Sequence, residues 1–182
     1  MSAGGSAPGA SLMADWRRWL PGAVAALYLI PVGLLLTGFL LSLAGLFRLR
    51  KTADIVQAPE WLGALAKAQA GFQFREGAAL LASDRVTSPI SWGFIRPVIV
   101  IDRATVAHGA DHATGIVAHE LAHLIRGDWL KLMIGRLAVA LFWFNPLVWK
   151  LAGEAHQLRE EATDDAVLSG GAQRTRYAEL LV

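Results

Sequence analysis

The sequence predicts an α+β fold that is mostly helical and anchored in a membrane. Three observations support this prediction. Residues 19–47 form an almost wholly apolar run with no charged side chain, long enough for a helix that spans a bilayer. The apolar run 114–125 carries two histidines four residues apart, a spacing that places both side chains on one face of a helix. Val98–Ile101 is a β-branched run, which is typical of a strand.

The composition of the 182 residues fits a membrane-associated chain better than a wholly soluble one. Hydrophobic residues make up 54% of the chain and charged residues 18%, and the mean hydropathy is +0.42. The net charge is only +2 and the basic residues are scattered, so direct binding of nucleic acid is not indicated. Because the chain has no cysteine, it can form neither a disulfide nor a cysteine-ligated zinc site.

The N-terminal segment is expected to hold one membrane anchor. Residues 1–15 are rich in Ser, Ala and Gly and are predicted to be disordered. Residues 16–50 are predicted to form one transmembrane helix with its flanks, in which Pro31 would introduce a kink. Basic residues are slightly more numerous after the apolar run than before it. This bias predicts a cytoplasmic location for the domain that follows, at the inner or plasma membrane.

Residues 51–182 are expected to form the second domain. Residues 59–70 have the pattern of a short amphipathic helix, and residues 72–85 contain two possible strands. Val98–Ile101 is predicted to be an edge strand, because Pro97 at its start cannot donate to a sheet ladder. Residues 175–182 resemble the opening of a helix without a stop signal, so we expect the chain to continue beyond them.

The most specific chemical signal is the pair His119 and His123, with Glu120 beside the first histidine. On a helix, both imidazoles can converge on one metal ion, and Glu120 would stand where a metal-bound water sits. Two histidine ligands and a general base are the arrangement of zinc hydrolases. The alternative is an ordinary helix with a buried or solvated histidine pair. We expect Asp111 or His112 to lead into the motif helix, with Asp111 the better cap.

A catalytic zinc ion usually needs a third protein ligand, and the best candidate is Glu160. His156, Glu160 and Asp164 fall four residues apart, so they share one face of a helix. Asp164 is expected to hold a ligand histidine from behind, in the outer shell of the site. Glu161 points about 100° away from this stripe and is the weaker candidate. The alternative for the whole cluster is a solvated acidic face.

Residues 128–168 are predicted to form a helical hairpin at or in the membrane. A single crossing between His123 and Glu160 would separate the two ligands by about 30 Å of hydrocarbon. Asn145-Pro146 has the form of an N-cap followed by a first-turn proline, so a helix that continues from His123 should reverse there. The tip of the hairpin is aromatic, which is typical of a membrane interface. Its aromatic residues are Phe142, Trp143, Phe144 and Trp149.

Several motifs occur in an order that resembles a known family. They are residues 119–123 with Arg126 and Asp128, residues 143–149, Arg159-Glu160, residues 164–168, and upstream Ser88-Pro89, Gly93 and Arg96-Pro97. Together they resemble the BlaR/MecR family of membrane-bound zinc metallopeptidases, which act as antirepressors and signal transducers. The resemblance covers about residues 55–180.

The resemblance implies a gluzincin-type zinc peptidase domain with a small edge sheet packed on the HExxH helix. Zn²⁺ would be bound by His119, His123 and Glu160, and Glu120 would be the general base of peptide-bond hydrolysis. The strand formed by Val98, Ile99, Val100 and Ile101 would bind the substrate by strand addition.

The implied function is a membrane-bound zinc endopeptidase of signal transduction. Its domain would face the cytoplasm and cleave a regulator such as a transcriptional repressor, or the chain itself by autoproteolysis. One alternative is a housekeeping protease of the prenyl-protein or heat-shock type, and another is a non-catalytic signalling scaffold, against which Glu120 argues. His156, Arg159 and Tyr177 are candidates for stabilising the oxyanion. Thr163 departs from the family pattern, because many members have cysteine there.

Overall fold

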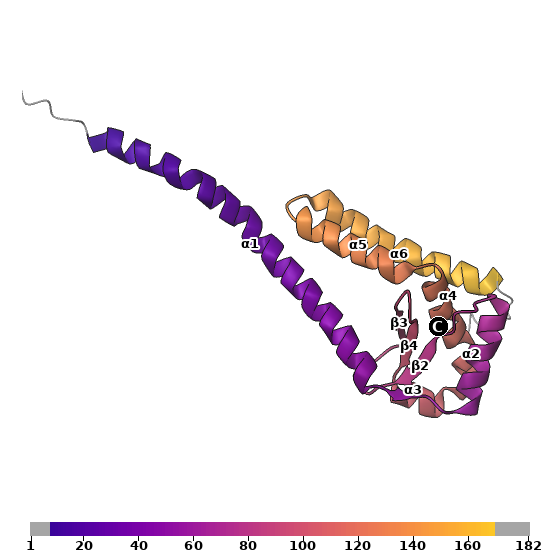
Figure 1. Cartoon of the computed structure of the whole chain (residues 1–182). Helices are drawn as coiled ribbons and strands as arrows, with labels where there is room; N and C mark the ends of the chain where they lie inside the picture. The colour runs from indigo at the N-terminus through magenta and orange to yellow at the C-terminus, as the bar shows by residue number, and fades with distance from the viewer. Residues whose placement is uncertain (1–7, 170–182) are drawn as a thin grey trace, which may run out of the picture.

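The computed structural model describes residues 8–169 of the chain, and the side chains of residues 16–168. The described part is mostly helical with one small mixed sheet, as the sequence predicts (Figure 1). Its elements follow in the order α1 (Pro8–Thr52), β1 (Asp54–Ile55), α2 (Pro59–Gly71), β2 (Ala79–Ala82), β3 (Ile90–Trp92), β4 (Val98–Ile101), α3 (Arg103–His108), η1 (Ala110–His112), α4 (Ala113–Ile125), α5 (Asp128–Leu141) and α6 (Pro146–Ser169).

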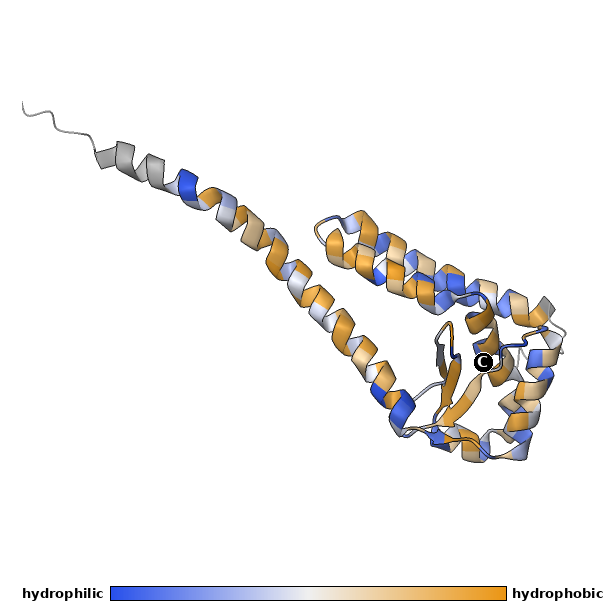
Figure 2. Ribbon diagram, in the orientation of Figure 1, coloured by the Kyte–Doolittle hydropathy of each residue, from blue (hydrophilic) through white to orange (hydrophobic). Residues whose placement is uncertain are grey.

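Helix α1 leaves the rest of the domain as a long apolar rod (Figures 1 and 2). Its part Trp16–Thr52 is long and apolar enough to cross a membrane, and very little of its most apolar stretch is buried. The helix runs through Pro21 and Pro31 without a break in its assignment. It already begins at Pro8, inside the segment predicted to be disordered. A proline at the first helical position loses no hydrogen bond, which suits it to start a helix. Residues 1–7 lie outside the described part.

The four-stranded sheet has the order β1-β2-β4-β3, which places β4 in the interior. The prediction of an edge strand at Val98–Ile101 is therefore wrong. β4 pairs in parallel with β2 on one side and antiparallel with β3 on the other, and all four of its residues are completely buried. Pro97 misled the prediction because it lies just before the paired residues, where its carbonyl accepts a hydrogen bond from Ala79 N at 3.0 Å.

The two faces of the sheet pack against different helices. On one face, Leu80, Ile99 and Ile101 join a core with residues of α2 and α4. On the other face, Val98 and Val100 pack with Trp92 and with Leu49 from the last turn of α1. The sheet thus packs on the helix that carries the two histidines, as expected, and the end of the apolar helix α1 is part of the same core.

The region 72–85 forms one strand, β2, rather than the two predicted. Phe72, Gln73 and Phe74 use their N–H groups to cap the end of α2, at the carbonyls of Ala68, Ala70 and Gln69. Gln73 also adopts a positive φ of 56°, which is uncommon outside turns. These N–H groups are therefore not available to a sheet, and both phenylalanines pack against the core from a loop.

Helix α4 has His112 as its N-cap rather than the preferred candidate Asp111, and it ends earlier than predicted. Asp111 lies in the short helix η1, and the N-cap of α4 is His112, without a side-chain hydrogen bond. The helix stops at Ile125 instead of continuing to Asn145. Gly127 interrupts it with a left-handed φ of 65°, a conformation that glycine adopts without steric cost. The chain changes direction there before α5 begins.

Helices α5 and α6 form the antiparallel hairpin expected from Asn145-Pro146 (Figure 1). Pro146 is the first residue of α6, and the Asn145 Oδ1 accepts a hydrogen bond from Leu147 N at 3.0 Å. The turn is closed by Trp149, whose Nε1 donates to the carbonyl of Trp143 at 2.8 Å. The exposed aromatic tip, with Phe142, Phe144 and Trp149, is thus a defined structure rather than a loose loop.

Replacement of Ile99 tests the interior position of β4. Ile99→Ala should lower the free energy of unfolding by about 2–5 kcal/mol, because it leaves a cavity in a completely buried site. Ile95→Ala is the matched control, since Ile95 is 88% exposed, and it should change stability by about 0.5 kcal/mol or less. Chemical unfolding in detergent, followed by tryptophan fluorescence, measures both. Equal losses for the two variants would contradict the placement of β4.

Candidate metal centre

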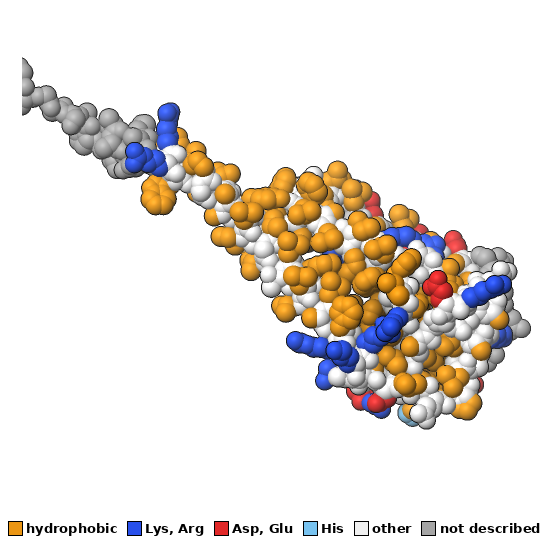
Figure 3. Space-filling model, viewed as in Figure 1, with side chains coloured by type: hydrophobic (Ala, Val, Ile, Leu, Met, Phe, Trp, Pro, Cys, Tyr) orange, Lys and Arg blue, Asp and Glu red, His pale blue; other side chains and the backbone are white. Residues whose placement is uncertain are grey.

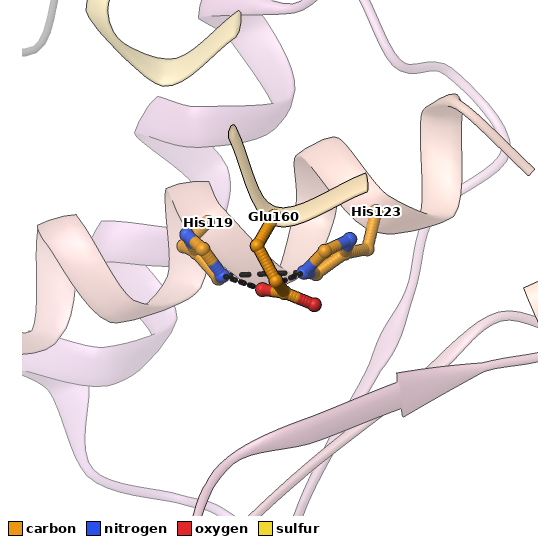
Figure 4. A group of neighbouring side chains, drawn as sticks. All are labelled: His119, His123 and Glu160. Atoms are coloured by element: carbon orange, nitrogen blue, oxygen red, sulfur yellow. Dashed lines mark hydrogen bonds and ion pairs between the residues drawn. The ribbon is translucent and has the colours of Figure 1, made fainter. Parts of the chain in front are cut away.

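The two motif histidines project from one face of α4 toward Glu160 of α6 (Figure 4). The opposite side of α4 is anchored in the core, where Val117 and Leu121 are completely buried. The histidines themselves are only partly buried. Because side chains repeat every 3.6 residues around a helix, Val117 and Leu121 lie on the face that packs in the core, and His119 and His123 lie on the opposite face.

Three donor atoms lie at distances that fit one metal ion. The two Nε2 atoms of His119 and His123 are 3.2 Å apart, and Glu160 Oε2 lies 3.7 Å and 3.5 Å from them. Ligands about 2.1 Å from a tetrahedral zinc ion are separated from one another by about 3.4 Å. The donor set of two imidazoles and one carboxylate therefore fits zinc in both chemistry and spacing.

Carboxylates stand behind both histidines. His123 Nδ1 lies 2.9 Å from Asp128 Oδ2, and His119 Nδ1 lies 3.3 Å from Asp164 Oδ1. A carboxylate at Nδ1 favours the tautomer that leaves Nε2 free to bind a metal ion. Asp164 is where the sequence predicts it. Asp128 was not assigned this role, although it belongs to the motif that carries the family resemblance.

Asp128 is also the centre of a polar cluster that joins three helices. It accepts hydrogen bonds from Lys131 Nζ at 2.9 Å and from Arg126 Nε at 3.4 Å. Arg126 also donates to the carbonyl of Ala162 on α6 at 3.1 Å. Thr163 Oγ1 lies 3.0 Å from His123 Nδ1 and is completely buried. We call these residues the Asp128 cluster; it fixes α6 against the start of α5 and the end of α4.

The charge of Asp128 is stabilised inside the fold although its side chain is only 2% exposed. Burial alone would raise the pKa of its carboxyl. The hydrogen bonds from His123 and Lys131 outweigh burial, so the pKa of Asp128 lies below its ordinary value. The side chain is therefore an anion at neutral pH and can accept a hydrogen bond from His123.

Glu120 is buried beside the two histidines, and no ion pair joins it to another residue whose side chain is described (16–168). Its residue is 7% exposed, and this burial raises the pKa of its carboxyl. The nearby Ser91 hydroxyl and His119 offset only part of this shift. The Ser91 hydroxyl donates its one proton to the backbone carbonyl of Glu120 at 3.0 Å. A carboxyl group with a raised pKa is suited to accept and return a proton near neutral pH.

Glu160 is kept as a carboxylate by its neighbour Arg159. Partial burial would raise the pKa of Glu160, but a hydrogen bond from Arg159 and the nearby histidines lower it below its ordinary value. Arg159 Nη2 lies 2.8 Å from Glu160 Oε1 and also 2.8 Å from His156 Nδ1. This leaves Oε2 to face the histidines. Glu161 is exposed, as its helical angle predicts, and Tyr177 lies outside the described residues.

The three donor atoms open into a cavity of about 750 Å³. One wall is the edge strand β3 with Ser88 and Pro89 before it, and Glu120 and Arg159 also line the cavity. Another wall is α1, through side chains that include Phe39 and Leu43. None of the residues Val98–Ile101 lines it. The strand next to the donor atoms is therefore β3, which sequence reasoning missed because it is only three residues long.

Two comparisons with known proteins show the family of the chain. A model of the family described as BlaR1 peptidase M56 matches residues 17–182. The chain is also similar to the "Regulatory protein BlaR1" of Bacillus licheniformis, with 31% identity over 151 residues. The aligned part is 83% of this chain but 25% of that protein, so the chain spans about a quarter of the length of its curated relative. Because the family match extends over almost the whole sequence, the chain belongs to the BlaR1 peptidase M56 family.

Proposed function

We propose that the protein is a membrane-bound zinc-dependent endopeptidase of signal transduction. The observation that carries this proposal is the convergence of His119, His123 and Glu160 beside the buried carboxyl group of Glu120. A metal site that serves only structure has no need of a general base next to its ligands. The buried Glu120 therefore favours an enzyme over a non-catalytic scaffold.

His119, His123 and Glu160 would hold the zinc ion through the atoms that face one another in Figure 4. When bound, zinc supplies Lewis acidity, which polarises the scissile carbonyl group and lowers the pKa of water. Asp128 and Asp164 hold the two imidazoles in orientation from behind. Arg159 holds Glu160 in the same way. Among the candidates for stabilising the oxyanion, Arg159 is the one that lines the cavity of the metal centre, beside Glu160.

Glu120 is the proposed general base. It takes a proton from the attacking water and later delivers that proton to the leaving amine of the cleaved peptide. Its raised pKa helps the second half of this task, because the carboxyl group must hold the proton until the amine departs. Ser91 positions the motif helix by its hydrogen bond to the Glu120 carbonyl.

The substrate is proposed to bind in extended form along β3 rather than β4. β3 lies at the edge of the sheet, so one of its sides is not paired within the sheet. It also lines the cavity together with Glu120. An extended peptide can add a strand to such an edge through main-chain hydrogen bonds. This replaces the strand addition at Val98–Ile101, which has partners on both sides.

The proposed substrate is a cytoplasmic regulator, such as a transcriptional repressor, or the chain itself. The similar protein of Bacillus licheniformis is named a regulatory protein, and this favours a signalling role over a housekeeping protease. The apolar helix α1 would anchor the chain in the inner or plasma membrane, with the peptidase domain facing the cytoplasm. The aromatic tip of the hairpin would enter the bilayer beside α1, because the Tyr28 hydroxyl on α1 donates to the carbonyl of Leu141 at 2.9 Å.

Replacement of Glu120 separates catalysis from metal binding. Glu120→Gln should retain zinc but lower peptidase activity by about 100-fold or more, because it removes the proton acceptor without removing a ligand. The matched control is Glu161→Gln, an exposed acid on α6 that should leave both properties unchanged. Zinc content is measured by atomic emission. Cleavage is assayed with two substrates, a co-encoded repressor and the chain itself. Normal cleavage by Glu120→Gln would rule out its role as the base.

Replacement of Asp128 tests the support of His123. Asp128→Asn should weaken zinc binding by about 10–100-fold, because it removes the carboxylate that orients the ligand histidine. Asp111→Asn, at an exposed position on η1, is the control and should bind zinc normally. Competition with a fluorescent zinc chelator measures both affinities. An unchanged affinity in Asp128→Asn would mean that the cluster serves folding alone.

A further inference from the structure

A second large cavity lies between α1 and the α5–α6 hairpin, with a volume of about 880 Å³. We call it the hairpin groove. Its walls are mainly apolar, with Leu34, Leu35 and Phe39 from α1 opposite Val139 from α5 and Leu158 from α6. Hydrophobic side chains cover α1 and continue over the neighbouring hairpin on the face seen in Figure 3. The groove is thus enclosed by the apolar elements of the protein rather than by its sheet core.

The hairpin groove carries an excess of positive charge. Its charged lining residues comprise one acid, Asp128, and four cations, Arg126, Lys131, Arg136 and Arg159. Three of the cations are already paired: Arg126 and Lys131 with Asp128, and Arg159 with Glu160. Arg136 differs, because no hydrogen bond or ion pair joins it to any residue in the range 8–169.

The position of Arg136 makes an unpaired cation costly in a membrane. It lies about 12 Å along α5 from Asp128 and about 14 Å from the turn at Asn145. Its groove partner α1 has no charged side chain anywhere in residues 19–47, so α1 offers it no anion. An arginine at the level of a transmembrane helix is stable only with a partner or with access to polar headgroups.

We propose that the hairpin groove binds an anionic phospholipid, with its phosphate group at Arg136 and its acyl chains along the apolar walls. The groove offers contacts for both parts of such a lipid. The guanidinium of Arg136 can bind the phosphate group through two hydrogen bonds. The side chains of Leu34, Leu35 and Val139 can cover a hydrocarbon chain. A zwitterionic lipid carries an ammonium group that opposes Arg136, so the site should prefer a net negative headgroup.

The lipid site would adjoin the candidate metal centre. Six residues line both the hairpin groove and the cavity of the metal centre: Phe39, Ser42, Asp128, Leu132, Arg136 and Arg159. A phospholipid in the groove therefore forms part of the wall behind the catalytic cavity. Its binding does not depend on peptidase activity, because none of the three donor atoms lies in the groove.

Native mass spectrometry of the full chain in detergent tests the site, with dioleoylphosphatidylglycerol and dioleoylphosphatidylcholine as the two probes. The wild-type chain should retain the anionic lipid about fivefold more than the zwitterionic one, and Arg136→Gln should lose this preference. Arg136→Lys should keep most of it. The matched control is Lys150→Gln, which removes an exposed cation of the same hairpin outside the groove and should keep the full preference.

Zinc content and circular dichroism establish that each variant is folded. Equal retention of the two lipids by the wild-type chain, or an unchanged preference in Arg136→Gln, would overturn the proposal. An equal loss of the preference in Lys150→Gln would also overturn the proposal, since it would indicate that surface charge in general attracts the anionic lipid. Retention of neither lipid, together with a dimer in the same mass spectra, would also overturn the proposal, since a second copy of the chain would then fill the groove instead of lipid.

Discussion

The rest of the structure depends on one constraint, that α4 and α6 must bring three donor atoms to within about 4 Å of one another. Helix α5 leads away from His123 and helix α6 returns to Glu160. The distance between the donor atoms of His123 and Glu160 therefore depends on the geometry of this hairpin. The Asp128 cluster fixes that geometry. Its members contact His123, the first turn of α5 and the backbone of α6 at distances of 2.9 to 3.4 Å. A single buried anion thus contacts His123 and also joins the three helices.

The parts of this site that follow from helical periodicity are predictable from the sequence. His119 and His123 share a face because they are four residues apart, and Asn145-Pro146 marks the turn because asparagine caps and proline starts a helix. Glu160 and Asp164 can be predicted from the same helical period, if one assumes that a metal ion at the two histidines needs a third ligand. Their distance from α4 does not follow, because it depends on contacts between residues far apart in the chain, such as Arg126 with the carbonyl of Ala162.

The sheet is less predictable because strand order depends on pairing between distant segments. Val98–Ile101 has apolar side chains at every position, a pattern typical of a strand buried on both faces. This pattern favours an interior strand, and Pro97 does not oppose it, because it lies just outside the paired residues. The edge strand that pairs with β4 is β3, which is short and lacks a run of β-branched residues. Its proximity to Glu120 rests on the hydrogen bond of Ser91, which no local pattern encodes.

The packing of Leu49 has a consequence for how the peptidase domain can be isolated. This residue belongs to α1, yet it is buried with Trp92, Val98 and Val100 on the second face of the sheet. A fragment that begins after Thr52 would expose this face to water and favour aggregation of the isolated domain. The last turn of the apolar helix α1 thus covers part of the hydrophobic core of the sheet. A useful soluble fragment should keep that turn and shorten α1 only upstream of Leu46, which also packs against this core.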